Sequence, residues 1–519
     1  MMTILKRSAQ FVGLLVLVLL IVFTVGVLWP AVPLADPPPV STPVALTNVT
    51  LVDVAYGTLV PNRTVLVTDD RISVVGHADS VSLPDGIQHL DGTGRYLLPG
   101  LWDMHTHLVR MSPALHYPLF IASGVTNVRD MGLASPSSCQ ENHDPFFICP
   151  GDRQTWNQQV AAGILVGPRL MGTPVFQLES LADLDLHVDP SDAALTRAAV
   201  GEFVATLARR GVDFIKLQLE EPLPPLVFET LLNQAQTASL PVVGHPPKQR
   251  SAAEAAPSMK SIEHARVFVQ ACFPEADAYR QGNLDWSAQL YQDMIEQHDP
   301  DQCDTVFAAF VANDTWFCPT HITRRWEALH HDPAYRQDER LRQVPLWQRL
   351  FWRVDSYFIG RAAATPDEQR ALMDFYQFGL ELTGRAHQRG VKLLAGTDAL
   401  DAYAFYGSGL HDELEELVKA GLTPAEALQT ATINPARFFG VTADYGSVAA
   451  GKKADLVVLA ANPLEDIRHT RRIEAVLVDG RLYNRAHLNR LTSTVETTAG
   501  SWHMNCKAVW RMIRSAVGA

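Results

Sequence analysis

The sequence lacks several features that would each indicate a particular class of protein. Its six cysteines include no Cys-x-x-Cys pair, which argues against a zinc site made of cysteines. Asp and Glu (56) outnumber Lys and Arg (43), which gives a net charge of -13. Nucleic-acid binding requires a basic surface, so this balance argues against nucleic acid as the main partner. No short-period repeat is evident, so a solenoid is not indicated.

The composition is that of an ordinary globular protein, with 47% hydrophobic and 19% charged residues. A chain of 519 residues is far longer than one small core needs. This length predicts either several domains or one large barrel with an accessory domain.

The N-terminal 30 residues differ from the rest of the chain. Lys6 and Arg7 precede an uncharged apolar run from Phe11 to Trp29, long enough to cross about 30 Å of hydrocarbon. The exit, "WPAVPLADPPP", is a poor cleavage site without a lipobox cysteine, so we favour an uncleaved membrane anchor over a cleaved signal peptide. Both alternatives place the protein outside the cytoplasm, anchored or periplasmic, because the positive charges stay inside. Residues 31–44 form a Pro-rich linker.

The cysteines fit an oxidising compartment. Cys139 and Cys149 flank one polar loop, and Cys272 and Cys303 bracket an insertion, so we predict two disulfide bonds. Cys318, in the apolar stretch "TWFCPT", is predicted to be a buried thiol.

The rest of the chain shows two kinds of sequence pattern. Residues 45–95 and 440–488 read as short strands with turns, which predicts one small β domain built from both parts. Residues 96–439 alternate eight strand candidates with helical patterns, which predicts a parallel (β/α)8 barrel. Residues 489–519 form a C-terminal extension that we expect to be helical.

Ligand-type side chains follow or end five of the predicted barrel strands. They are His105 and His107 in "LPGLWDMHTHL", Lys216 in "FIKLQL", His245 in "VVGHPP", His264 in "IEHA" and Asp398 in "LLAGTDA". His105 and His107 are two residues apart in a strand, so their rings point to the same face and could share a metal ion. Lys216 alternates with Ile215 and Leu217 and should point into the barrel; the alternative is a lysine that reaches solvent or pairs with Glu220 or Glu221.

These stretches resemble the amidohydrolase superfamily, in particular its imidazolonepropionase-like and prolidase-like enzymes. Further matching pieces are "GVTNVRDMG", "GPRLMG", "LHDELEELVKAGLTPAEALQTATINPARFFG" and "GSVAAGKKADLVVLAANPLEDI", in order along the chain. The resemblance implies a metal-bearing barrel with a small β-sandwich formed from both ends of the chain.

The resemblance also implies roles for the matching residues. His105, His107 and Asp398 would bind one divalent ion, and His245 and His264 a second. Lys216, carboxylated to a carbamate, would bridge the two together with a hydroxide. Ligands of this mixed type fit Zn²⁺. Asp398 would in addition accept the proton of the hydroxide and pass it to the leaving group.

The implied activity is hydrolysis of an amide bond in a small peptide-like substrate, such as an Xaa-Pro dipeptide or an N-acyl amino acid. A cyclic amide or lactone is the alternative substrate class, and a non-catalytic, membrane-anchored binding protein is a second alternative. Tyr117, Arg266 and His321 lie near strand ends and are candidate substrate contacts, although each could instead be structural. A homo-oligomer is left open.

Overall fold

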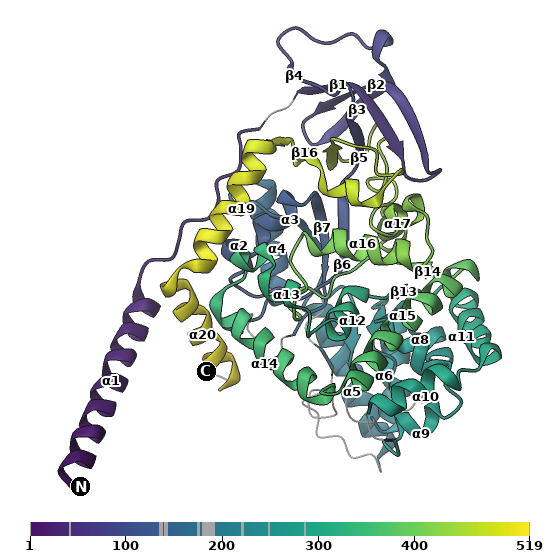
Figure 1. Ribbon diagram of the computed structural model, residues 1–519. Coiled ribbons are helices and arrows are strands. Elements are labelled where there is room, and N and C mark those ends of the chain that lie inside the picture. Colours follow the sequence, from purple (N-terminus) through teal and green to yellow (C-terminus); the bar gives the residue numbers. More distant parts are fainter. Residues whose placement is uncertain are drawn as a thin grey trace.

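The computed structural model describes residues 2–40, 43–133, 139, 144–173, 177–178, 192–218, 223–247, 250–284 and 287–517. A mixed sheet lies at one end of the molecule, and the parallel strands and most of the helices lie below it (Figure 1). The N-terminal helix lies at the side of the molecule, next to the last helix of the chain (Figure 1).

The mixed sheet is built from both ends of the chain, as predicted. Its strands lie in the order β17-β16-β15-β5-β1-β2-β3, and β4 pairs with β1. Their bounds are β1 Val44–Asp53, β2 Thr58–Thr68, β3 Arg71–His77, β4 Gln88–Asp91, β5 Tyr96–Pro99, β15 Leu456–Leu459, β16 Ile473–Val478 and β17 Arg481–Asn484. Asp479 and Gly480 both adopt positive φ between β16 and β17, which suits a tight hairpin turn. A sandwich of two sheets stays a prediction, as do the domain boundaries.

The predicted barrel strands are all present, but their pairing does not close into one barrel within the described residues. They form two parallel sheets, β6-β7-β8 and β14-β13-β12-β11-β10-β9. The first contains β6 Leu101–Thr106, β7 Val125–Asp130 and β8 Arg169–Gly172. The second contains β9 Gln177–Leu178, β10 Ile215–Leu217, β11 Val242–Gly244, β12 Ser261–Glu263, β13 Trp316–Cys318 and β14 Lys392–Leu393.

The two parallel sheets are joined by irregular backbone bonds where ladders were expected. Between β6 and the segment 395–399, Met104 N–H donates to the Ala395 carbonyl over 2.9 Å, Asp398 N–H to the His105 carbonyl over 2.7 Å and His107 N–H to the Ala399 carbonyl over 2.9 Å. At the other junction, Asp213 N–H donates to the Thr173 carbonyl over 3.2 Å. The chain beyond β14 no longer follows strand geometry, since Asp398 and Leu400 have positive φ. A regular β14–β6 ladder is therefore replaced by a loop that carries one of the predicted ligands.

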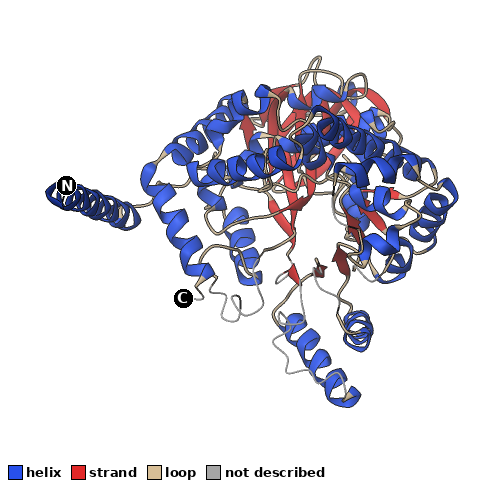
Figure 2. Cartoon of the chain, turned by 60° about the horizontal axis from the view of Figure 1, so that its bottom comes forward, coloured by secondary structure: helices blue, strands red, loops and turns tan. Residues whose placement is uncertain are grey.

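Helices surround the strands (Figure 2). Those between the strands are α2 Ser112–Leu115, α3 Tyr117–Ala122, α4 Pro150–Ala161, α5 Ala193–Arg209, α6 Pro225–Thr237, α7 Ala252–Ala255, α8 Arg266–Ala271, α9 Ala276–Arg280, α10 Ala288–Glu296, α11 Pro300–Ala312, α12 His321–Ala328, α13 Pro333–Gln337, α14 Leu346–Ala362 and α15 Pro366–Gln388. Those after β14 are α16 Gly409–Lys419, α17 Pro424–Thr430, α18 Ile433–Phe438, α19 Arg485–Gly500 and α20 Trp502–Ala516.

Helix α5 illustrates how the sequence determines these elements. The Asp192 carboxylate accepts the backbone N–H groups of Ala194 and Leu195 and so caps the helix. Val200, Val204 and Leu207 then recur at helical spacing and are buried. The same spacing predicts α6 and the helical C-terminal extension, and both are confirmed.

The N-terminal helix α1, Met2–Leu28, contains one segment, Gln10–Leu28, that is long and apolar enough to cross a membrane. The two predicted disulfides, Cys139–Cys149 and Cys272–Cys303, are formed, and Cys318 is a buried free thiol as predicted.

Candidate metal and active site

The predicted ligands meet at one edge of the parallel sheets. His105 lies in β6 and Lys216 in β10, whereas His107, His245 and His264 directly follow β6, β11 and β12. His107, Lys216, His245, His264 and Asp398 line one cavity of about 340 Å³. His105 is completely buried beneath it and contacts Asp398. Residues that are far apart in the sequence thus converge as predicted.

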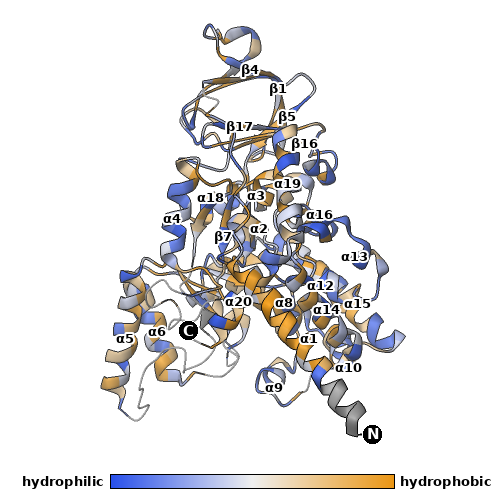
Figure 3. Cartoon of the chain, turned by 90° about the vertical axis from the view of Figure 1, so that its left-hand side faces the viewer, coloured by the Kyte–Doolittle hydropathy of each residue, from blue (hydrophilic) through white to orange (hydrophobic). Residues whose placement is uncertain are grey.

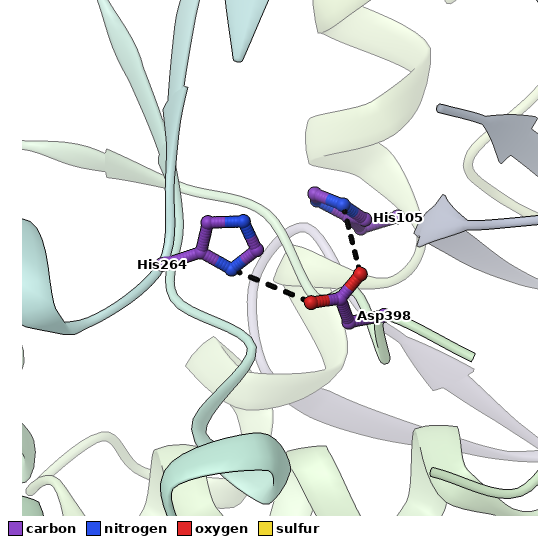
Figure 4. A group of neighbouring side chains, drawn as sticks. All are labelled: His105, His264 and Asp398. Atoms are coloured by element: carbon purple, nitrogen blue, oxygen red, sulfur yellow. Dashed lines mark ion pairs between the residues drawn. The ribbon is translucent and has the colours of Figure 1, made fainter. Parts of the chain in front are cut away.

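Asp398 lies at the centre of this group (Figure 4). Its Oδ1 lies 3.2 Å from His105 Nε2 and 2.9 Å from His107 Nε2. Its Oδ2 lies 3.6 Å from His264 Nδ1. The ligand atoms of His105, His264 and Asp398 all lie within 4.8 Å of one another, which is the spacing of a metal site.

The outer nitrogens of His105 and His107 are held by hydrogen-bond acceptors. His105 Nδ1 lies 3.0 Å from Glu263 Oε2, and His107 Nδ1 lies 2.9 Å from the Gly132 carbonyl oxygen. With a proton on each Nδ1, both Nε2 lone pairs face the Asp398 carboxylate. Lone pairs at these distances repel unless a cation or a proton lies between them, so the arrangement fits a metal ion with oriented ligands.

His245 and His264 form the second pair of predicted ligands. Their ring centroids are 4.6 Å apart, and His264 Nδ1 lies 2.9 Å from Thr320 Oγ1. His245 Nε2, like His105 Nε2, is buried without a hydrogen-bond partner among the described residues. Buried imidazole nitrogens of this kind fit metal ligation, because an unsatisfied polar atom is otherwise costly.

Burial and charge act in opposite directions on these groups. Burial, helped by the Lys216 cation, lowers the pKa of His107 to about 4. Burial also lowers the pKa of His245 and of His264 well below the ordinary value. Burial disfavours the imidazolium of His105 too, but the Asp398 and Glu263 carboxylates outweigh it and raise its pKa. The two ring nitrogens of His105 thus each face a carboxylate, and a cation bound at Nε2 would be stabilised by the same negative charge.

Lys216 is almost completely buried, with 1% of its surface exposed. The alternative in which its side chain reaches solvent is therefore wrong. Glu220 and Glu221, the other suggested partners, lie outside the described residues. Burial lowers the pKa of Lys216 to about 8, and Asp398 and Glu263 limit that decrease. A lower pKa leaves more of the lysine as the neutral amine, which is the form that can add carbon dioxide.

Two of the predicted ligands have unusual backbone conformations. His264 has φ 76° and Asp398 has φ 60°, in the left-handed region that non-glycine residues rarely occupy. Such a conformation costs on the order of 1–3 kcal/mol and persists only where the surroundings impose it. Here it turns both side chains toward the cavity.

The three predicted substrate contacts have different outcomes. Arg266 lines the cavity and also a neighbouring one of about 380 Å³, and its contact with a substrate stays a prediction. Tyr117 is buried in the core, where its hydroxyl donates to the Pro168 carbonyl oxygen over 2.7 Å. His321 is also buried, and its Nε2 lies 3.0 Å from Thr383 Oγ1. Neither residue lines these two cavities, because packing against the core uses their side chains.

Three residues at the site, Arg324, Glu263 and Asp103, were not expected from the sequence. Arg324, in α12, lines the cavity beside Arg266. Glu263 precedes His264 and supports His105 from behind, and Arg129 donates to both Glu263 oxygens at 2.9 and 3.0 Å. Asp103 accepts the backbone N–H groups of His105 and Thr397. Asp103 lies on the same face of the strand as His105 and His107, because side chains alternate along it. The sequence pattern could therefore have predicted that Asp103 belongs to the site.

Comparison with known families and curated proteins gives short matches. The model of the Amidohydrolase family matches residues 379–483. Adenine deaminase 2 of Rhizobium meliloti (strain 1021) is 46% identical over 74 residues, which is 14% of this chain and 11% of the relative. Adenine deaminase 1 of Carboxydothermus hydrogenoformans is 35% identical over 92 residues, 18% of this chain and 14% of the relative. The aligned parts are thus a small fraction of these enzymes.

Similarity to solved structures extends over most of the chain. Bottromycin amidohydrolase superposes with a TM-score of 0.66 at 24% identity and covers 88% of this chain and 90% of that one. A putative prolidase from Bifidobacterium longum has a TM-score of 0.58 at 22% identity, over 89% of this chain and 100% of that one. A Xaa-Pro dipeptidase with bound methionine has a TM-score of 0.58 at 19% identity, over 85% and 99%. At these identities the likeness establishes the fold.

Proposed function

The chain belongs to the amidohydrolase superfamily, and we propose that it is a metal-dependent hydrolase that cleaves an amide bond of a small peptide-like substrate. An Xaa-Pro dipeptide or an N-acyl amino acid is the substrate class we favour. The observation that carries this proposal is the convergence of three histidines, Lys216 and Asp398 on a single cavity, with His105 directly beneath it. The superposition with a dipeptidase and a prolidase supports the choice of substrate class.

Two divalent ions, of which Zn²⁺ fits the nitrogen and oxygen donors best, would be held by this group. His105, His107 and Asp398 would hold one ion, and His245 and His264 the other. Lys216, as a carbamate, would supply the anionic oxygens between them. Once bound, the ions supply a water acidic enough to act as hydroxide near neutral pH and a Lewis acid for the substrate carbonyl.

Asp398 is the group that we propose moves the proton. Burial opposes its ionisation, but His105 and His264 keep its pKa well below the ordinary value, so it is a carboxylate at neutral pH. It accepts the proton of the attacking water and passes it to the leaving nitrogen. Thr397 supports it, because its N–H and its hydroxyl both donate to the Asp103 carboxylate, at 3.0 and 2.7 Å.

Arg266 and Arg324 favour a substrate that carries a free carboxylate. Both line the cavity, and both side chains are partly buried. Burial, together with Arg324, lowers the pKa of Arg266, as expected of two cations held close together. Glu327 pairs with Arg324 at 2.5 Å. A substrate carboxylate would offset the remaining repulsion and would fix the amide relative to Asp398.

The same proposal includes the architecture and the location. The two parallel sheets would correspond to a (β/α)8 barrel whose closure runs through the loop at 395–399. The mixed sheet would belong to a β-sandwich domain. Helix α1 would anchor the protein, with the catalytic part outside the cytoplasm, where the two disulfides are stable.

A panel of substrates tests this function. Protein loaded with Zn²⁺ in bicarbonate buffer is assayed against Xaa-Pro dipeptides, N-acyl amino acids and the same compounds with the carboxylate converted to an amide. We expect turnover of the acids and a large loss of kcat/KM with the amidated controls. Cyclic amides, lactones and adenine complete the panel, since the short sequence matches are to adenine deaminases. Selective turnover of one of these would overturn the peptide-like assignment, and no turnover by fully metallated protein would favour a binding protein.

A further inference from the structure

Helix α14 carries a row of large apolar side chains on its outer surface. Leu346, Leu350, Val354 and Phe358 are spaced four residues apart, so they lie one above another along the helix. Between 49% and 60% of each side chain is exposed. Phe351 and Tyr357 lie beside the row and are equally open to solvent. A stripe of this length on a soluble surface indicates a partner.

Helix α20 carries a second stripe of the same kind. Trp502, Trp510, Ile513 and Val517 recur at helical spacing at the end of the chain, and 42% to 68% of each is exposed. The opposite side of α20 is buried, with Met504 and Ala508 as its fully packed residues.

The two helices form one structural unit. Trp347, at the start of α14, shares a buried cluster with Met504 and Ala508 of α20. The Trp347 backbone N–H also donates to Asn505 Oδ1 over 3.2 Å. We call the exposed residues of both helices together, 346, 350, 351, 354, 357, 358, 502, 510, 513 and 517, the α14–α20 face.

Helix α20 also packs directly on α1. The rings of Trp29 and Trp502 are 6.3 Å apart, and Lys507 Nζ donates to the Val27 carbonyl oxygen over 2.5 Å. A Cβ on Gly26 would lie 2.6 Å from the Trp502 ring, so the close approach of the two helices depends on this glycine. Figure 3 shows the apolar helix α1 beside α20. The α14–α20 face is therefore continuous with the one helix able to cross a membrane among the residues that the structure describes.

The charges on these two helices differ from those of the whole chain. Helix α14 has Arg349, Arg353 and Arg361 against one acidic residue, Asp355. Helix α20 has Lys507, Arg511 and Arg514 and no acidic residue in its sequence. The chain as a whole carries a net charge of -13. Basic and aromatic residues flanking an apolar stripe are the pattern of a helix that lies in the headgroup region of an anionic bilayer.

We propose that the α14–α20 face docks into the interfacial region of an anionic lipid bilayer, next to the point where α1 enters it. This inference is independent of the proposed hydrolysis, and it rests on α1 crossing the membrane. The catalytic part would then be held against the bilayer by three helices, α1, α14 and α20, and would not move freely on a linker. A second copy of the chain is the competing occupant of the same face.

Site-directed spin labelling of the full chain in vesicles tests the proposal. The label is placed at Val354→Cys, with Val311→Cys as the matched control, in a Cys506→Ala background. Val354 (50% exposed) and Val311 (47%) are equally exposed valines, but Val311 lies in α11 on the other side of the molecule (Figure 1). The vesicles contain phosphatidylethanolamine and phosphatidylglycerol, and the readout is the ratio of the label's collision rate with oxygen to its collision rate with a nickel chelate. We expect this ratio to be at least about threefold higher for the label at 354 than for the label at 311.

Each other outcome would overturn the proposal. Equal ratios of oxygen to nickel-chelate collisions at 354 and 311 would show that the α14–α20 face is exposed to water. Dipolar broadening between labels at 354, without a gain in oxygen collisions, would show that a second copy covers the face. Equal insertion into phosphatidylcholine vesicles would remove the role of the six basic residues, because neutral headgroups do not attract them.

Discussion

The Glu263 carboxylate holds the His105 ring from the side away from the cavity, with Oε2 3.0 Å from Nδ1 and both side chains fully buried. Arg129 and Ser261 in turn donate to Glu263. A continuous set of hydrogen bonds thus runs from Arg129 through Glu263 to His105, whose Nε2 lies 3.2 Å from Asp398 Oδ1. The orientation of a candidate metal ligand is therefore fixed by a residue that lies behind it.

Glu263→Gln should weaken metal binding while leaving every direct ligand in place. The amide keeps the shape of the side chain but is a weaker acceptor and has no charge to balance Arg129. We expect about a 10–100-fold rise in the Kd for Zn²⁺, the usual effect of removing such a supporting group. Competition with a fluorescent chelator measures this, with Glu275→Gln as a control outside the site. An unchanged Kd would mean that the contact between Glu263 and His105 has no bearing on metal binding.

Asp398→Asn should separate metal binding from proton transfer. Asparagine retains one oxygen donor and loses the base, so kcat should fall at least about a hundredfold. Steady-state kinetics with metal content measured on the same samples would show this. Asp332→Asn, at the exposed cap of α13, provides a control for the substitution itself. A near-normal kcat would remove Asp398 from the mechanism.

Lys216→Ala should lose at least one metal ion and most activity, because it removes the proposed carbamate. Lys216→Arg should fail as well, since a guanidinium stays cationic and does not take up carbon dioxide. Elemental analysis of protein purified with and without bicarbonate gives the readout, and a short carboxylic acid such as acetate should partly restore Lys216→Ala. Two metals and full turnover in Lys216→Ala would replace the binuclear proposal by a single site on His105 and His107.

Asp412 should make stability depend on acid pH. Its carboxylate lies 2.5 Å from Arg471, 2.9 Å from Arg340 and 3.4 Å from Arg325. Burial opposes ionisation, but Arg340 and the other two arginines lower the pKa of Asp412 from 3.8 to about 2. A lowered pKa stabilises the folded state above the unfolded value, and this contribution is lost as the pH falls from about 4 toward 2. It amounts to about 2 kcal/mol.

The check compares the free energy of unfolding of the native chain and Asp412→Asn at pH 7, 4 and 2.5. The amide of the variant cannot ionise, so the gap between the two proteins should shrink as the pH falls. The control is Asp338→Asn, because Asp338 pairs with Arg340 alone among the described residues. This substitution should change the free energy of unfolding by less. A gap that stays constant with pH would show that Asp412 is not held ionised by its arginines.

Local patterns in the sequence were sufficient for several parts of this protein. The i, i+2 spacing of His105 and His107 determines that both rings share one face, because side-chain direction alternates along a strand. The burial of Lys216 follows from its alternation with Ile215 and Leu217. The Asp479–Gly480 turn, the apolar length of α1 and the loops bounded by cysteine pairs are equally local, and the structure confirms the turn, the helix and both bridges.

Other features depend on contacts between distant segments, which no local pattern encodes. Tyr117 and His321 look like site residues at strand ends, but packing determines that their side chains point into the core. Arg324 reaches the cavity only because α12 folds back over it. The strands were predicted individually, whereas closure between β14 and β6 depends on the loop that carries Asp398, where irregular backbone bonds and an isolated bridge replace the ladder. Sequence thus determined which residues could bind a metal, and tertiary packing decided which of them meet, because convergence depends on the path of the chain between them.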